Sequence, residues 1–162
     1  MKKLSSVSVS GLRPIGQKLE TVLYVEDDDD NWQIANLRLS HAYDLLRART
    51  AEEACDLITA RKADLSAILM DIALSGSDFN GVELTEILRG KRPKERLPEY
   101  AKRAPVLTST PIIFVTAHVS KYSDTMLTRA GGDRVIPKPV DFAALSLALT
   151  QLHLARMQQR RT

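Results

Sequence analysis

Short apolar runs alternate along this chain with longer segments in which polar residues are mixed with apolar ones. Runs rich in aliphatic and β-branched residues are typical of strands, and the segments between them are long enough for helices. Three of the runs, at 21–25, 65–70 and 112–115, are apolar at both alternating positions, which is typical of central parallel strands covered on both faces. The pattern predicts five strands, at 21–25, 43–46, 65–70, 112–115 and 134–136.

Residues that favour helix starts precede the intervening segments. Thr50 opens a capping-box pattern, and Asn80 and Asp141 are good N-caps. We expect an acidic residue near Asp30 to cap the first helix and Ser120 to cap the fourth. The predicted helices cover about 32–39, 51–61, 81–89, 121–130 and 142–154. Strands that alternate with helices predict an α/β fold, a doubly wound five-stranded parallel sheet with helices on both faces.

Two stretches depart from this rhythm. Residues 1–19 are rich in Ser, Gly and Pro and predict a flexible tail, and residues 91–111 form an unusually long connection with four prolines. The apolar residues of this connection favour folding back, with a helical turn near 98–103. Its basic residues outnumber its acids, so we expect most of that charge to face water or a protein partner. The domain then covers 20–155, followed by a basic C-terminal tail at 156–162.

Composition and charge exclude several classes of protein. The chain is 44% apolar and 27% charged, as in ordinary globular proteins. Its net charge of +3 arises from basic segments at 2–18, 89–103 and 156–161, which leaves an acidic body without a helix-turn-helix or zinc-finger pattern. We therefore expect no direct nucleic-acid binding. No apolar run is long enough to span a membrane, so we expect a cytoplasmic protein without membrane insertion. Cys55 is the single cysteine, which excludes an internal disulfide.

The residues that follow the strands carry the candidate chemistry. Glu26 and Asp27 follow the first strand, Asp71 the third, Thr116 the fourth and Lys138 the fifth. Open parallel sheets bind ligands at the carboxyl ends of their strands, and in the flavodoxin-like strand order 2-1-3-4-5 the first and third strands are neighbours. Three carboxylates that converge there repel one another, and oxygen ligands without His or Cys suit Mg²⁺. A hydroxyl and an ammonium beside them suit a phosphate oxyanion.

Several motifs then fall in a recognisable order. They are VLYVEDD at 22–28, ILMD at 68–71, NGVEL at 80–84, PIIFVTAH at 111–118 and PKP at 137–139. With this set, the chain from about Glu20 to Leu154 resembles the receiver domain of two-component response regulators.

The resemblance implies a role for each site residue. Asp71 would be the phosphoacceptor, and Thr116 and Lys138 would read the phosphoryl group. Mg²⁺, with Mn²⁺ as an alternative, would be held by Asp27 with Glu26 beside it, by Asp71 and by the backbone carbonyl of Ala73. The Lys138–Pro139 bond would be cis, as is usual in the family.

The resemblance also implies partners and leaves two functions open. In the first, the chain is a stand-alone receiver that takes its phosphoryl group from a sensor histidine kinase or phosphotransfer protein and signals to a downstream protein. It would catalyse only its own phosphorylation and dephosphorylation, so it is not a conventional enzyme. In the second, it is a pseudo-receiver that binds proteins without phosphorylation. Val135 stands where many receivers carry an aromatic switch residue.

Overall fold

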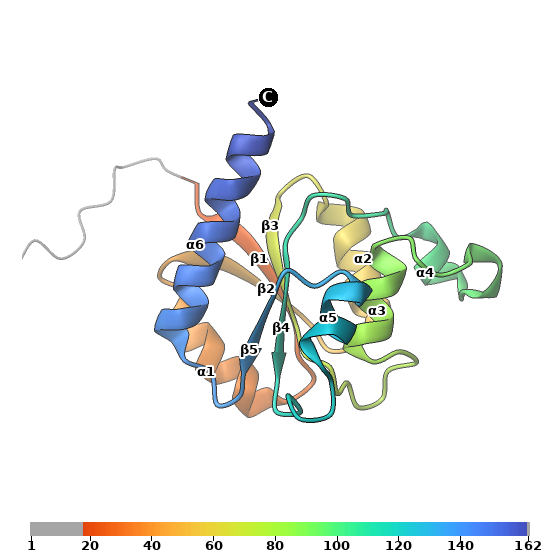
Figure 1. Cartoon of the computed structure of the whole chain (residues 1–162), viewed down its shortest axis with the longest axis horizontal. Coiled ribbons are helices and arrows are strands. Elements are labelled where there is room, and N and C mark those ends of the chain that lie inside the picture. The colour runs from red at the N-terminus through yellow and green to blue at the C-terminus, as the bar shows by residue number, and fades with distance from the viewer. Residues whose placement is uncertain (1–17, 162) are drawn as a thin grey trace, which may run out of the picture.

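A computed structural model describes residues 18–161 and shows a five-stranded parallel sheet with the strand order β2-β1-β3-β4-β5 (Figure 1). The strands are β1 (Glu20–Val25), β2 (Tyr43–Ala48), β3 (Leu65–Met70), β4 (Ile112–Thr116) and β5 (Arg134–Pro137). All five runs predicted from the sequence are strands, and the predicted strand order is confirmed. The register pairs Val25 with Met70, so the residues that follow β1 and β3 emerge side by side.

Helices cover both faces of the sheet, as predicted (Figure 1). They are α1 (Asp29–Leu39), α2 (Ala51–Arg61), α3 (Gly81–Leu88), α4 (Glu99–Arg103), α5 (Asp124–Ala130) and α6 (Phe142–Gln159), with a short 3₁₀ helix, η1 (Lys94–Arg96). α1 and α6 lie on one face, and α2, α3 and α5 lie on the other. Each face buries its own apolar cluster, so the sheet is the middle of three layers.

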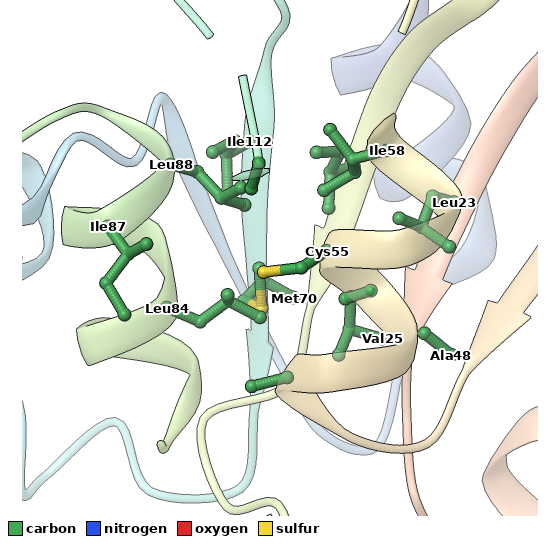
Figure 2. Close-up of a cluster of buried hydrophobic side chains, with 14 of the residues drawn as sticks. Leu23, Val25, Ala48, Cys55, Ile58, Met70, Leu84, Ile87, Leu88 and Ile112 are labelled. Carbon is green, nitrogen blue, oxygen red and sulfur yellow. The ribbon is translucent and has the colours of Figure 1, made fainter. Parts of the chain in front are cut away.

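The larger cluster lies between β1, β3, β4 and the helices α2 and α3 (Figure 2). Cys55 of α2 points into it beside Met70 of β3 and is fully buried. Burial raises the pKa of the Cys55 thiol to about 12, so it packs as a small apolar side chain. On the opposite face Trp32 is half-buried and packs against the second cluster.

Capping explains where the helices begin, with two differences from the sequence expectations. Asp28 caps α1, Asn80 forms a complete capping box at α3, and Asp141 caps α6. At α2, Thr50 accepts from the Glu53 N–H as expected, but the Glu53 carboxylate accepts instead from the N–H of Arg49.

The prediction that Ser120 caps the fourth helix is wrong. Ser123 is the cap, because its hydroxyl accepts from the Met126 N–H, and residues 120 and 121 lie in a turn.

The connection at residues 91–111 folds back onto the domain. The expected helical turn is present as α4, which packs against α2. Leu97, Tyr100 and Leu107 are buried within the larger cluster, although Val106 remains 37% exposed. The connection is therefore part of the core.

Its charges are also more paired than its own sequence suggests. Arg92 lies 2.7 Å from Glu86 of α3, and Arg103 lies 3.8 Å from Asp56 of α2. Within the described residues, Lys94 and Arg96 form no ion pair and are exposed.

The expected tail at 1–19 lies outside the described residues, apart from Lys18 and Leu19. The last helix does not stop at Leu154, as expected, but continues to Gln159. Arg156, which the sequence placed in a basic tail, donates from Nη1 to the backbone oxygens of Leu65 and Ser66. None of the helices in the described part of the chain could span a membrane.

Candidate functional site

Three carboxylates meet at the carboxyl end of the sheet. Glu26 and Asp27 follow β1, and Asp71 follows β3. One oxygen from each side chain lies within 4.8 Å of the other two, so the convergence expected from the strand order is present. Such a group of oxygens without nitrogen or sulfur ligands fits a hard divalent cation such as Mg²⁺.

Lys138 places a positive charge against two of these carboxylates. Its Nζ lies 2.7 Å from Glu26 Oε2 and 2.9 Å from Asp71 Oδ2. Burial acts to lower the pKa of Lys138, but its hydrogen bonds to the two carboxylates outweigh burial and the pKa is raised. The lysine is therefore a fixed ammonium at neutral pH. The peptide bond between Lys138 and Pro139 is cis, as expected.

The pKa of the Asp71 carboxylate is set by burial and by the charges around it, which act in opposite directions. Asp71 is 6% exposed, and its Oδ1 accepts from the Ile72 N–H at 2.7 Å. Burial raises its pKa to about 6, the hydrogen bond and charge of Lys138 act in the opposite direction, and the charge of Glu26 raises it further. At neutral pH Asp71 is still an anion, partly desolvated and next to an ammonium.

Glu26 is fully buried and carries the densest set of hydrogen bonds. Its Oε2 accepts from the Tyr24 hydroxyl at 3.0 Å as well as from Lys138, and its Oε1 accepts from the Asp28 N–H at 3.1 Å. Burial and the nearby Glu26 carboxylate both raise the pKa of Tyr24, so its hydroxyl stays a donor. A buried carboxylate is stable only with such partners.

Asp27 faces the loop that follows β3 and is more exposed to solvent than Glu26 and Asp71. Its Oδ2 accepts from the Ser75 N–H at 2.9 Å, which joins the β1–α1 loop to the loop that follows β3. Ala73 lies in that second loop and is exposed. Asp27 and the loop around Ala73 thus border the same edge of the acidic cluster.

Thr116 ends β4 beside the site but does not contact the carboxylates. It is fully buried, and its Oγ1 accepts from the His118 N–H at 3.0 Å. Within residues 18–161 its hydroxyl forms no hydrogen bond to the side chain of Asp71 or Lys138, although the Lys138 N–H donates to the Thr116 carbonyl at 2.9 Å. The structure therefore gathers four of the five expected side chains at the end of the sheet, and the hydroxyl of Thr116 is instead hydrogen-bonded to the next loop.

Arg47 of β2 is a site residue that the motifs did not reveal. Its Nε donates to the Glu26 carbonyl and its Nη2 to the Asp27 carbonyl, both at 3.0 Å, while Nη1 lies 2.7 Å from Asp29 Oδ1. The guanidinium also lies over the ring of Trp32, 5.6 Å from its centroid. Its strand pairs with β1, and only this pairing could have indicated the contact.

The glycine of the NGVEL motif has a steric role. A Cβ on Gly81 would lie 1.9 Å from the backbone oxygen of Asp71. The Gly81 N–H donates to the Ile72 carbonyl at 2.8 Å, so the start of α3 lies directly against the backbone that carries Asp71. The ILMD motif and the NGVEL motif are therefore packed against each other at the site.

Comparison with known proteins agrees with this geometry. The sequence model of the response regulator receiver domain matches residues 22–150. The uncharacterized transcriptional regulatory protein YrkP of Bacillus subtilis is 29% identical over 119 residues, which cover 73% of this chain and 42% of that protein. The nitrogen assimilation regulatory protein NtrX of Azorhizobium caulinodans is 26% identical over 141 residues, 86% of this chain and 27% of that protein. The chain thus spans less than half the length of these relatives.

Solved structures show the same fold. A putative response regulator from Chloroflexus aurantiacus is 26% identical with a TM-score of 0.64, over 85% of this chain and 99% of that one. A CheY-like receiver domain protein from Methanospirillum hungatei is 24% identical with a TM-score of 0.67, over 88% of this chain and 99% of that one.

These findings define the class as a flavodoxin-like receiver fold with a cluster of acidic side chains. The chain belongs to the response regulator receiver domain family, which acts in two-component signalling.

Proposed function

We propose that this receiver accepts a phosphoryl group on Asp71 in a reaction that depends on a divalent cation. One observation carries the proposal. The Asp71 carboxylate lies 2.9 Å from the Lys138 ammonium and has an oxygen within 4.8 Å of the carboxylates of Glu26 and Asp27. A nucleophilic anion is thus placed beside a fixed positive charge and a set of metal ligands.

The chemistry follows from the charges that must be balanced. An Asp71 oxygen attacks the phosphorus of a phosphohistidine or a small phosphodonor, the bond from phosphorus to the donor breaks, and an acyl phosphate forms on Asp71. Negative charge on the phosphoryl oxygens lies near Lys138, which can leave one carboxylate oxygen and pair with a phosphoryl oxygen.

The residues that would hold the cation are Glu26, Asp27, Asp71 and the carbonyl of Ala73. Their oxygens fit Mg²⁺, with Mn²⁺ as an alternative, and the ion supplies charge neutralisation between the carboxylates and the phosphoryl oxygens. Asp27 contributes from the accessible side, because Glu26 is already engaged by Tyr24 and Lys138.

Thr116 is proposed to respond to the phosphoryl group. Its hydroxyl oxygen accepts from the His118 N–H, so the hydroxyl proton can still be donated to a new acceptor on Asp71, and a shift of the hydroxyl toward that acceptor would draw the β4–α5 loop with it. Val135, on the neighbouring strand, is half-buried against the larger cluster and offers no aromatic ring for this movement.

We propose a sensor histidine kinase or phosphotransfer protein as the donor and a downstream protein as the receiver of the signal, in the cytoplasm. In this proposal the chain acts as a stand-alone receiver through protein contacts rather than through direct nucleic-acid contacts. The exposed Lys94 and Arg96 on the connection favour an acidic partner.

The test is an intact-mass measurement after incubation with acetyl phosphate and Mg²⁺. We expect one added phosphoryl group on the wild-type protein and none on Asp71→Asn, which keeps the shape but removes the anion. Omission of the cation should abolish the addition. A folded wild-type protein that gains no phosphoryl group from acetyl phosphate or from a kinase would instead support a pseudo-receiver that binds proteins without phosphorylation.

A further inference from the structure

A polar cavity of about 450 Å³ lies at the end of the sheet opposite Asp71. It is formed where α2 ends, where the connection enters β4, and along the last turns of α6, whose C-terminal end is marked in Figure 1. The basic and hydroxyl side chains that line it are Lys62, Arg156, Arg160, Thr108, Ser109 and Thr110. We propose that this cavity binds the phosphate group of a small phosphorylated molecule.

The first observation is an excess of positive charge without an acid. Lys62, Arg156 and Arg160 line the cavity, and no Asp or Glu is among its lining residues. Burial, and then the nearby charge of Arg160, lower the pKa of Arg156, so the two guanidinium groups repel each other. An anion between them would relieve that repulsion.

The second observation is a set of hydrogen-bond donors without acceptors. Arg156 Nη1 is anchored to the oxygens of Leu65 and Ser66, at 3.0 and 3.3 Å, but its buried Nε finds no partner among the described residues. A buried N–H without an acceptor is unfavourable. An anion oxygen in the cavity gives this N–H an acceptor once the guanidinium turns toward it.

Three hydroxyls on one bend add further donors. Thr108, Ser109 and Thr110 are consecutive, and within residues 18–161 none of their hydroxyls has a hydrogen-bond partner. Thr110 as a residue is only 4% exposed, whereas Thr108 and Ser109 are exposed to solvent where they line the cavity. Hydroxyl and guanidinium donors that converge are typical of phosphate recognition.

The chain offers little of its own to neutralise this cavity. Asp64 lies at the neighbouring corner but is held by Lys18 at 3.1 Å and by Arg61 at 3.4 Å. Residues 1–17 contain no Asp or Glu. The negative charge is therefore expected from a separate molecule.

The cavity also suits a small molecule larger than phosphate itself. Its volume falls within the range of ligand pockets. Ala60, Ala63 and Leu107 form an apolar part of its wall. β3 has six residues and separates the cavity from Asp71 by about 20 Å, so a phosphate there is distinct from the phosphoryl group on Asp71.

The test is a titration of the whole protein with inorganic phosphate and with glycerol 3-phosphate, without Mg²⁺ and at constant ionic strength. Backbone amides and arginine Nε–H groups are followed by nuclear magnetic resonance. We expect saturable shifts at Arg156 Nε and at the amides of 108–110, with tighter binding of the ester if the ligand body also contacts the wall. Equal affinity for both probes would identify free phosphate as the ligand.

A pair of charge-matched variants decides the outcome. Lys62→Gln with Arg160→Gln removes two exposed cavity charges and should weaken binding about tenfold or more. Lys94→Gln with Arg96→Gln removes the same charge from the connection and should leave binding unchanged. Shifts that never saturate, or equal weakening in the two double variants, would overturn the proposal, because they would show only diffuse attraction to a basic surface.

Discussion

Arg47 on β2 donates to the backbone carbonyl of Asp27, 3.0 Å away, and so fixes the loop that carries a proposed metal ligand. The same guanidinium donates to the Glu26 carbonyl and pairs with Asp29 at the start of α1. Its hydrogen bond is the first cause that lowers the pKa of Asp29. A residue outside the motifs therefore sets the position of the acidic loop by holding the backbone of Glu26 and Asp27 rather than their carboxylates.

Arg47→Gln is expected to loosen this loop. The Arg47 side chain is 13% exposed, and its loss leaves two carbonyls without donors, so we expect a loss of about 1–3 kcal/mol in the free energy of unfolding. The affinity for Mg²⁺ should fall as well, because Asp27 is no longer held. Urea unfolding and Mg²⁺ titration measure the two effects.

Arg49→Gln is the matched control for this variant. Arg49 also pairs with Asp29, at 2.8 Å, but it is 51% exposed and makes no contact with the loop carbonyls. It should change both measurements little. If the two variants lose Mg²⁺ affinity equally, the carbonyl contacts of Arg47 do not position the site.

Mg²⁺ is expected to stabilise the folded protein through Asp27. Cation binding to the native state alone raises stability, by about 1–3 kcal/mol at saturating metal. Thermal melts with and without Mg²⁺ should therefore differ for the wild-type protein and coincide for Asp27→Ala.

Asp30→Ala serves as the control, because Asp30 is an exposed acid of the same run outside the cluster. This variant should keep the full response to Mg²⁺. An undiminished response in Asp27→Ala would mean that the stabilising ions bind elsewhere.

Gly81→Ala tests the contact between α3 and the backbone of Asp71. The added Cβ would lie 1.9 Å from the Asp71 oxygen, so the helix or the site must shift, and we expect a loss of about 1–3 kcal/mol or more. Phosphorylation of Asp71 should slow in the same variant. Gly76→Ala, at a positive φ but with open space around it, should lose stability without slowing phosphorylation; equal slowing in both would contradict the steric role.

Tyr100 tests whether the connection belongs to the core. It is 8% exposed, and its hydroxyl donates to Asp78 at 3.1 Å. Tyr100→Ala should destabilise the domain by about 3–5 kcal/mol, whereas Tyr100→Phe, which removes only the hydroxyl, should lose about 1 kcal/mol. Unfolding curves that coincide for wild type and Tyr100→Ala would make the connection a mere surface extension.

The sheet and most of the candidate site could be predicted from the sequence, for a physical reason. Central parallel strands are apolar on both faces, so 21–25, 65–70 and 112–115 stand out, and functional residues follow directly where these runs end. The convergence of Glu26, Asp27 and Asp71 then depends only on strand order.

The features that could not be predicted from the sequence depend on contacts between segments that are distant along the chain. The partner of Arg47 is set by the pairing of β1 with β2, and Arg103 of the connection pairs with Asp56 of α2 rather than with a nearby acid. Ser120 and Ser123 are equally good caps by type, and only the path of the β4–α5 loop selects Ser123.

The central claim is that Asp71 is the residue that carries the phosphoryl group, and borohydride trapping tests it most directly. Borohydride reduces an aspartyl phosphate to homoserine, which peptide mass mapping then locates. After incubation with acetyl phosphate and Mg²⁺, we expect homoserine at position 71 alone, and none when the cation is omitted. Homoserine at position 27, hydroxynorvaline (the product of a reduced glutamyl phosphate) at position 26, or an unmodified residue 71 in protein that has gained a phosphoryl group would contradict the account.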